Sequence, residues 1–386
     1  MADLLLGFDP GTSLTKIIYR IVKNQKESNH KQHLLFMEPE TIKLPASSIN
    51  NLITDINRAS PEDSAWFKQN KRDNQIHLVG FIAQRFQARL NMEKLKYESA
   101  VAKITAAVGA IAQKHQNHLG HKFTLAIAAL LPYGEYSNRK QLEEQIKSNL
   151  KRFYFQEQKI QANLKSFRCL PEGGGLALAL GREEGEQWLR KRNIAILVFG
   201  HRNTSLLYFQ RGAIQKGETT DLGFYQMLDS IIRNTSGQNR NTLAQTVFAI
   251  GNNIEPSSPL IKSLVKSKKP ENIKIEIEQL TKSIKSARQE YWILIRNWLR
   301  AALPKEINQI VICGGAAKYL KKEIVSFFPD QPLYWGHDKQ SEILNQFRSQ
   351  LEQNRSSKDI DNLAYRLTDI YCLSDLFTTD PNMTTA

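Results

Sequence analysis

Two segments of the chain repeat one pattern, an apolar strand, a turn with a glycine and a second apolar strand. The first spans Leu4 to Val22 with Gly11 in its turn, and the second spans Ile194 to Phe209 with Gly200 in its turn. An offset of 189 positions carries Gly11 onto Gly200. The same offset aligns two further identical pairs, Thr15 with Thr204 and Tyr19 with Tyr208. Because strands joined by a tight turn form hairpins, the sequence predicts a duplicated α/β fold with one hairpin tip from each half.

Length and composition are consistent with such a fold. The chain has 386 residues, 41% of them hydrophobic, which leaves room for two domains with substantial cores. Its 53 lysines and arginines exceed its 38 aspartates and glutamates, and the formal net charge of +15 favours anionic partners such as nucleotides, nucleic acid or membrane. Three widely spaced cysteines, the lack of a leader-like N-terminus and the lack of a long apolar segment predict a cytoplasmic protein.

The pattern along the chain predicts two domains. Domain I comprises residues 1–165 with a small peripheral insertion at about 38–90, and domain II comprises residues 166–360 with a helical, basic insertion at about 223–285. A last helix at 361–376 is expected to pack back on domain I, and the tail 378–386 is expected to be disordered. Periodicity predicts further helices at 92–113, 275–303 and 314–324, and further strands at 123–131 and 309–313.

The first turn carries residues that suit a phosphate group. Glycine at position 11 lets backbone N–H groups approach phosphate oxygens, and the hydroxyls of Thr12 and Ser13 add donors. Lys16 supplies a positive charge, and Asp9 can hold Mg²⁺ through water. An Asp-Pro-Gly sequence is also an ordinary turn, so this segment alone leaves both interpretations open.

Two further segments match this chemistry. The second turn offers Gly200, Arg202, Asn203 and Thr204, and two such tips would hold a polyphosphate from both sides. The third segment is a strand followed by the start of a helix, at Gly314, Gly315 and Ala316. Glycines at such a junction allow the backbone to approach a flat ring, or a phosphate at a helix N-terminus. Three such segments in one chain are more specific than any one of them.

These motifs together resemble a known family. The order DPGTSLTK, LPYGEY, CLPEGGGLALAL, VFGHRNTS and QIVICGGAAKYL is similar to the actin-like ATPases, specifically the bacterial ParM-type filament proteins. The resemblance implies two related α/β domains with ATP or ADP in the cleft between them, Mg²⁺ beside Asp9, and polymerisation coupled to the nucleotide. It also implies that Glu135 of LPYGEY orients the attacking water. Glu135 could alternatively be a carboxylate that the dipole of a helix N-terminus favours.

One position departs from the family. Two residues before its glycine, the second phosphate motif normally has an acidic residue that matches Asp9, but here it has Val198. Loss of that carboxylate, and the cations of His201 or Arg202 nearby, predict ATP binding with slow, Mg²⁺-dependent hydrolysis.

Two further clusters of side chains lie outside these motifs. His115, His118 and His121 recur at every third position, but neither a carboxylate nor a cysteine lies near them in sequence, so a metal is not expected there. The helix at 275–303 presents Lys282, Lys285 and Arg288, and Lys282 is the candidate for a contact with the nucleotide.

The resemblance implies three functional alternatives. The first is a self-assembling helical filament that segregates plasmid DNA through a small DNA-binding adaptor of the ParR type, so that contact with DNA is indirect. The second is a cytoskeletal filament near the inner membrane that controls cell shape, where the basic subunit would be attracted to anionic lipid. The third, from another class, is a small-molecule kinase of the same fold.

Overall fold

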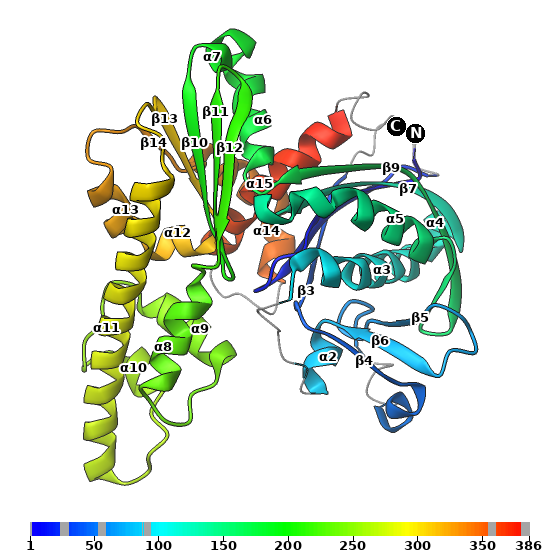
Figure 1. The fold of residues 1–386 in the computed structure, drawn as a ribbon. Helices are drawn as coiled ribbons and strands as arrows, with labels where there is room; N and C mark the ends of the chain where they lie inside the picture. The colour runs from blue at the N-terminus through cyan, green and yellow to red at the C-terminus, as the bar shows by residue number, and fades with distance from the viewer. Residues whose placement is uncertain are drawn as a thin grey trace. The chain divides into compact units, whose positions relative to one another are not determined.

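The computed structural model describes residues 2–23, 31–52, 59–86, 88, 94–353 and 360–379. The chain forms two compact units, one made of Met1–Trp188 with Gly336–Ala386 and the other of Leu189–Trp335. Each contains one sheet with helices packed on it (Figure 1). The boundaries of these units differ from those of the domains predicted at 1–165 and 166–360. That domain division stays a prediction.

The first unit is built on a nine-stranded sheet in the order β3-β2-β1-β7-β9-β8-β5-β6-β4. Its strands are β1 (Leu4–Asp9), β2 (Thr15–Ile21), β3 (His33–Met37), β4 (Thr41–Pro45), β5 (Trp66–Lys68), β6 (Gln75–Val79), β7 (Lys122–Leu131), β8 (Phe153–Phe155) and β9 (Gln158–Pro171). The sheet is mixed, because β1, β7 and β9 run parallel to one another whereas β1, β2 and β3 alternate in direction. Strands β4, β5 and β6, with the short helices η1 (Ala46–Leu52) and α2 (Phe81–Arg85), come from the predicted insertion at 38–90.

Helices cover both faces of this sheet. Alternate residues of a strand point to opposite faces, and Leu4, Leu6 and Phe8 of β1 belong to the core that includes α3 (Lys96–Lys114) and α5 (Arg139–Leu150). Gly7 faces the other way, toward α15 (Ile360–Thr379), which also packs on α6 (Gly174–Glu184) and α14 (His337–Glu352). The remaining short helices of this unit are α4 (Gln116–Leu119) and η2 (Tyr133–Asn138), and the boundary between the units falls within α7 (Glu186–Arg190).

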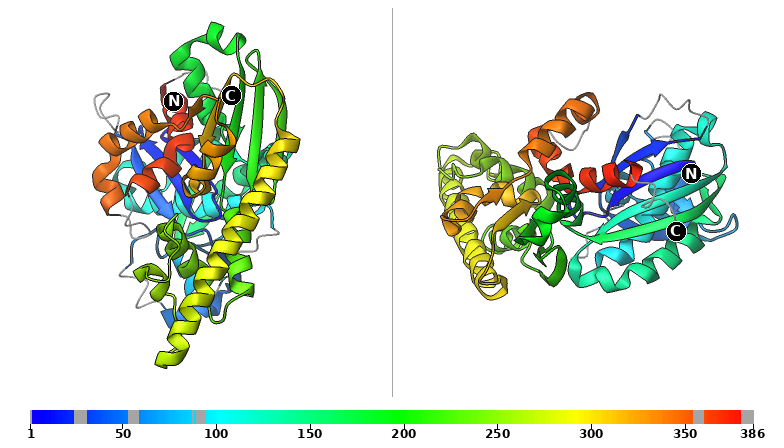
Figure 2. Two further views of the ribbon diagram at one scale, coloured as in Figure 1. Left: turned by 90° about the vertical axis from the view of Figure 1, so that its left-hand side faces the viewer. Right: turned by 90° about the horizontal axis from the view of Figure 1, so that it is seen from above.

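The second unit has a five-stranded sheet in the order β12-β11-β10-β13-β14. Its strands are β10 (Asn193–Phe199), β11 (Thr204–Gln210), β12 (Ala213–Thr220), β13 (Gln309–Cys313) and β14 (Leu333–Tyr334). Its helices are α8 (Phe224–Arg233), α9 (Arg240–Ile250), α10 (Pro259–Lys262), α11 (Pro270–Ala302), α12 (Gly315–Tyr319) and α13 (Lys321–Phe327). Helix α11 comprises 33 residues. Figure 2 shows it, in yellow, as one unbroken helix.

The two sheets share one topology. The order β3-β2-β1-β7-β9 has the same strand directions as β12-β11-β10-β13-β14. The hairpins also share one register, because Asp9 pairs with Lys16 in the first and Val198 pairs with Ser205 in the second, which is again an offset of 189 positions. The predicted duplicated α/β fold is therefore confirmed.

Most predicted elements form, with shifted ends. The helix predicted at 275–303 begins earlier, at Pro270, because proline suits the first turn of a helix, where an N–H has no partner to lose. The helix predicted at 314–324 is two helices that meet at Leu320. Arg288 donates a hydrogen bond to the carbonyl of Tyr319 at 2.9 Å, next to this junction.

Some sequence predictions fall on other residues. The helix predicted at 92–113 corresponds to α3, which begins at Lys96, and residues 89–93 lie outside the described residues. In the predicted disordered tail, Thr378 and Thr379 belong to α15, and residues 380–386 lie outside the described residues.

Candidate functional site

The first hairpin tip joins the end of β1 to the start of β2. A Cβ atom added at Gly11 would lie 2.4 Å from the carbonyl oxygen of Leu14, so the turn is tight enough to require glycine. At the base of the turn, the carboxylate of Asp9 forms an ion pair with the ammonium of Lys16. Ser13 is exposed at the tip. The structure therefore brings together the residues that the sequence predicts to bind phosphate and metal on this side.

A basic side chain of the C-terminal helix adds to this tip. The Arg366 guanidinium of α15 donates a hydrogen bond to Ser13 Oγ at 2.9 Å, and Lys16 Nζ donates to the Arg366 carbonyl at 3.0 Å. No local sequence pattern identifies Arg366, because Lys16 and Arg366 are separated by 350 positions.

Helix α3 supplies a second residue that sequence analysis missed. Lys103 Nζ donates to the carbonyl of Gly11 at 3.4 Å, and the side chain is only 1% exposed. Burial, together with the nearby charge of Lys96, lowers the pKa of Lys103 to about 8. A single lysine within the apolar sequence VAKITAAVGAIA was the signal that could have identified it.

Three carboxylates of the same unit, two of them buried, accept hydrogen bonds. Glu135, in the turn after β7, accepts a hydrogen bond from the backbone N–H of Tyr97 at 3.0 Å, and so caps the start of α3. Glu135 therefore interacts with a helix N-terminus, which was the alternative to a catalytic role. The helix is α3, not the one that follows Glu135 in the sequence.

The other two carboxylates follow β9 and lie on α15. Glu172 accepts from Lys96 Nζ at 2.5 Å, and both side chains are buried. Asp369 accepts from the backbone N–H groups of Gly173 at 2.6 Å and Leu176 at 3.2 Å, at the start of α6. Burial raises the pKa of Asp369 to about 7.

The second hairpin tip has the same turn without the ion pair. A Cβ atom at Gly200 would lie 2.7 Å from the carbonyl oxygen of Asn203. Val198 and Ser205 stand at the positions of Asp9 and Lys16, so neither charge of the first pair is present. The expected binding residues Arg202, Asn203 and Thr204 are all buried, and Thr204 Oγ1 donates to the carbonyl of Leu222 at 2.7 Å.

The third predicted segment lies directly against this tip. Gly314 has a φ of 89°, and a Cβ atom there would lie 2.3 Å from the carbonyl oxygen of Phe199. Gly315 begins α12, and Ala316 is buried. Gly314 is therefore required by contact with the neighbouring strand, whatever it contributes to a ligand.

The three basic residues of α11 differ in their surroundings. Lys282 is exposed, and Lys285 forms an exposed ion pair with Glu255 at 3.3 Å. Arg288 is buried, donates to Glu323 at 2.7 Å and lies over the ring of Tyr319 at 4.4 Å. Its guanidinium holds α11 against α12 and α13.

His115, one of the three histidines where a metal is not expected, contacts Tyr19 and His33. His115 Nε2 lies 2.9 Å from the hydroxyl of Tyr19, and its ring is 5.5 Å from that of His33. Within the part of the chain that the structure describes, no three or more His, Cys, Asp or Glu side chains are grouped as they would be around a metal ion.

The first tip fits a phosphate group and its metal on chemical grounds. It combines hydroxyl donors, two cationic side chains and the carboxylate oxygen that Mg²⁺ prefers. Each tip also holds a buried oxygen without a hydrogen-bond partner among the described residues, Thr15 Oγ1 in the first and Asn203 Oδ1 in the second. Buried polar atoms rarely lack a partner, and a bound ligand is one explanation.

Several solved structures resemble the whole chain. An archaeal actin homolog matches with a TM-score of 0.60 and 12% identity, covering 98% of this chain and 100% of that one. ParM of a 15-stranded filament from Clostridium botulinum matches with a TM-score of 0.59 and 16% identity, covering 97% and 100%. The actin-like protein Alp7A matches with a TM-score of 0.58 and 12% identity, covering 96% and 95%. This chain has the actin-like fold.

The actin-like fold that the motifs implied is thus confirmed. No protein-family model matches the sequence, and no curated protein matches it. At such low identity the likeness concerns the fold, which supports many functions, so function must be argued from this chain's own residues. In the described part of this actin-like chain, none of the helices has the length and apolarity that a membrane span requires.

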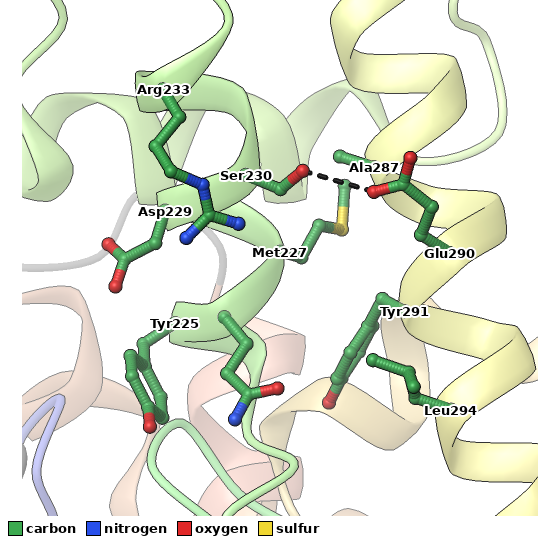
Figure 3. A pocket seen from close by; sticks show the side chains of 10 residues that line it. Tyr225, Met227, Asp229, Ser230, Arg233, Ala287, Glu290, Tyr291 and Leu294 are labelled. Atoms are coloured by element: carbon green, nitrogen blue, oxygen red, sulfur yellow. Dashed lines mark hydrogen bonds between the residues drawn. The ribbon is translucent and has the colours of Figure 1, made fainter.

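A separate pocket lies in the second unit, between α8 and α11. Figure 3 shows Tyr225 and Asp229 on one side, Tyr291 and Leu294 on the other, and a hydrogen bond of 3.1 Å from Ser230 Oγ to Glu290. No residue predicted to bind nucleotide lines it.

Proposed function

We propose that this protein binds ATP or ADP with Mg²⁺ through its two hairpin tips and polymerises into nucleotide-dependent filaments of the ParM type. The observation that carries the proposal is the pair of hairpins with one register and one glycine-enforced turn. Solved relatives named as filament proteins support it, among them ParM of the Clostridium botulinum filament. Subunits that join head to tail leave an open interface at each end, which produces filaments.

The proposed binding roles follow from the contacts of each residue. Thr12, Ser13 and the backbone at Gly11 would donate to phosphate oxygens, with Lys16 neutralising their charge. Asp9 would hold Mg²⁺ through water, and bound Mg²⁺ neutralises charge that develops on transferring phosphate groups. Gly200, Arg202, Asn203 and Thr204 would contribute from the second tip. Gly314, Gly315, Ala316 and Lys282 are proposed for the adenosine part.

Hydrolysis is proposed to be slow. Glu135 is the candidate for orienting the attacking water, and its Oε2 atom accepts a hydrogen bond from the backbone of α3 at 3.0 Å. A second carboxylate at position 198 would help to hold Mg²⁺ and this water, but Val198 offers only hydrocarbon.

Restoring that carboxylate tests the explanation. In Val198→Asp, we expect phosphate release per subunit to rise about 10-fold or more over the wild type, in the range typical of one general acid–base or electrostatic contribution. Val198→Asn is the matched control, with the same shape and no charge. Equal rates in Val198→Asp and the wild type would show that Val198 does not limit hydrolysis.

Filament formation is tested by sedimentation and negative-stain electron microscopy. The purified chain should form pelletable filaments with ATP and Mg²⁺, and markedly fewer with Lys16→Gln. Arg300→Gln, an exposed change on α11, is the control that should still polymerise. No polymer at any magnesium or salt concentration, together with phosphorylation of a sugar or carboxylate, would establish the small-molecule kinase instead.

The cargo is a separate part of the proposal. The ParM-type assignment implies segregation of plasmid DNA through a ParR-type adaptor, with DNA contacted only indirectly. A fluorescently tagged chain should then form cytoplasmic foci or spindles that move with plasmid DNA. Cortical sheets near the inner membrane would instead support a filament that controls cell shape.

A further inference from the structure

Helix α15 is fixed at three points along its length, two of them on the first hairpin and one on α6. Lys16 Nζ donates to the carbonyl of Arg366 at 3.0 Å. One turn further along, Asp369 packs so closely on α6 that a Cβ atom at Gly175 would lie 2.1 Å from its carbonyl oxygen. Near the end of the helix, a Cβ atom at Gly7 would lie 1.9 Å from Ser374 Oγ. A side chain on such a rigid element is held in position for binding.

The strand alternation places Arg366 and Asp9 on the same side of the sheet. Gly7 of β1 faces α15, and Asp9, two residues further, therefore points to the same face. Arg366 extends from this helix to the turn, where its guanidinium meets Ser13 Oγ at 2.9 Å. The charges of Asp9 and Glu38 both act on it.

The guanidinium has the chemistry to do more than support the turn. It carries five N–H donors in a planar fork and can hold Ser13 and a phosphate oxygen at the same time. With Lys16 it places two cations at a turn whose backbone and hydroxyl donors also suit an anion. The Ser13 hydroxyl alone does not require a charged partner such as Arg366, because a neutral donor could make the same hydrogen bond.

We propose that Arg366 binds the polyphosphate of the nucleotide directly at the first tip. This inference rests on the proposed nucleotide binding. It assigns a phosphate contact to the C-terminal helix, which none of the phosphate motifs includes.

Equilibrium binding of ATP and adenosine separates this role from support of the fold. For Arg366→Gln we expect the affinity for ATP to fall about 10-fold or more, as for loss of a charge-assisted hydrogen bond. Adenosine carries no phosphate, so its affinity should stay unchanged. Arg366→Lys should restore part of the ATP affinity, and Arg300→Gln, exposed on α11, should leave it unchanged.

The comparison of the two ligands separates this result from damage to the fold, because a loss of folded protein lowers the affinities for ATP and adenosine alike. Unchanged ATP affinity in Arg366→Gln, or equal losses for ATP and adenosine, would overturn the proposal.

Inorganic tripolyphosphate tests the site without the adenosine part. If the wild type binds neither ATP nor adenosine but its melting temperature rises with tripolyphosphate, and Arg366→Gln loses this rise, nucleotide binding is wrong and the phosphate contact stands. If tripolyphosphate stabilises the wild type and Arg366→Gln equally, the contact is wrong. If neither ATP nor tripolyphosphate binds the wild type, both proposals fail.

Discussion

Lys103, which contacts the first tip, carries its charge in surroundings that disfavour a charge. Lys103 is buried beneath the turn, and its pKa is lowered to about 8 by that burial. A lysine with a lowered pKa binds its proton less tightly in the folded than in the unfolded protein. Below pH 8 it is nevertheless charged in both states, so burial of the charge reduces stability there. As the pH rises from 8 toward the ordinary value of 10.5, this cost disappears.

Removing the charge should therefore stabilise the protein at neutral pH. For Lys103→Met we expect the free energy of unfolding at pH 7 to rise by up to about 3 kcal/mol, the equivalent of the lowered pKa. The gain should shrink at pH 9.5, as measured by urea denaturation. Lys114→Met, on the same helix with the side chain 45% exposed, is the control and should change stability little. A gain that is equal at both pH values would contradict the titration of Lys103 as its cause.

The glycine of the first turn gives a second prediction. A Cβ atom in Gly11→Ala would lie 2.4 Å from a backbone oxygen, which cannot move aside as a side chain can. We expect a loss of about 2 kcal/mol or more in the free energy of unfolding. Thr12→Ala in the same turn should cost less than about 1 kcal/mol. Equal losses in the two variants would mean that the turn opens easily.

At the scale of elements, one buried ion pair joins the start of α3 to the end of β9. Lys96 and Glu172 are both under a tenth exposed and are bonded at 2.5 Å. Removing one partner of a buried pair leaves an uncompensated charge, which is far more costly than removing both. The pair therefore fixes how α3 meets the sheet next to the first tip.

A double-mutant cycle measures this coupling. Lys96→Met and Glu172→Gln should each lower the free energy of unfolding by about 3–5 kcal/mol, and the double variant should lose much less than their sum. The exposed pair Lys285 and Glu255 is the control, with coupling below about 1 kcal/mol. Additive losses at positions 96 and 172 would show that the two side chains do not interact.

Elements with strong local patterns could be predicted from the sequence, and those that depend on distant partners could not. Both hairpins, α11 and β13 follow apolar periodicity and turn residues. Strand β9 was missed because polar residues fill its exposed positions, Lys159, Asn163, Lys165 and Arg168, although its buried positions largely alternate. The hydrogen bond of Arg288 to the Tyr319 carbonyl at the break spans 31 positions, and the contact of Arg366 with Ser13 spans 353 positions. Neither leaves a local signal.

For the whole molecule, the net charge is unevenly divided between the two units. Leu189–Trp335 contains 22 lysines and arginines against 11 aspartates and glutamates, a formal +11 of the chain's +15. The other unit is also positive, so no acidic unit is available to attract it in a second copy. Long-range repulsion between copies should therefore oppose assembly, and salt screens such repulsion over about 10 Å at 0.1 M.

Assembly should accordingly increase with moderate salt. If the chain polymerises with ATP and Mg²⁺, the pelleted fraction should rise as the salt concentration increases from about 0.02 M to about 0.15 M, because the Debye length shortens over this range. The critical concentration measured by light scattering should fall in parallel. A pelleted fraction that falls over this range would show that ion pairs between neighbouring subunits outweigh the overall repulsion.

The bonds from Lys16 and Ser13 to Arg366 also bear on the order of events during synthesis. The turn emerges from the ribosome early, whereas its partner on α15 follows about 350 residues later. At elongation rates of about 5–20 residues per second, the delay is roughly 20–70 s. Until then Lys16 and Ser13 lack these partners. A nascent chain, or one interrupted before Arg366, therefore presents an incomplete phosphate site and should be excluded from any nucleotide-dependent assembly of finished subunits.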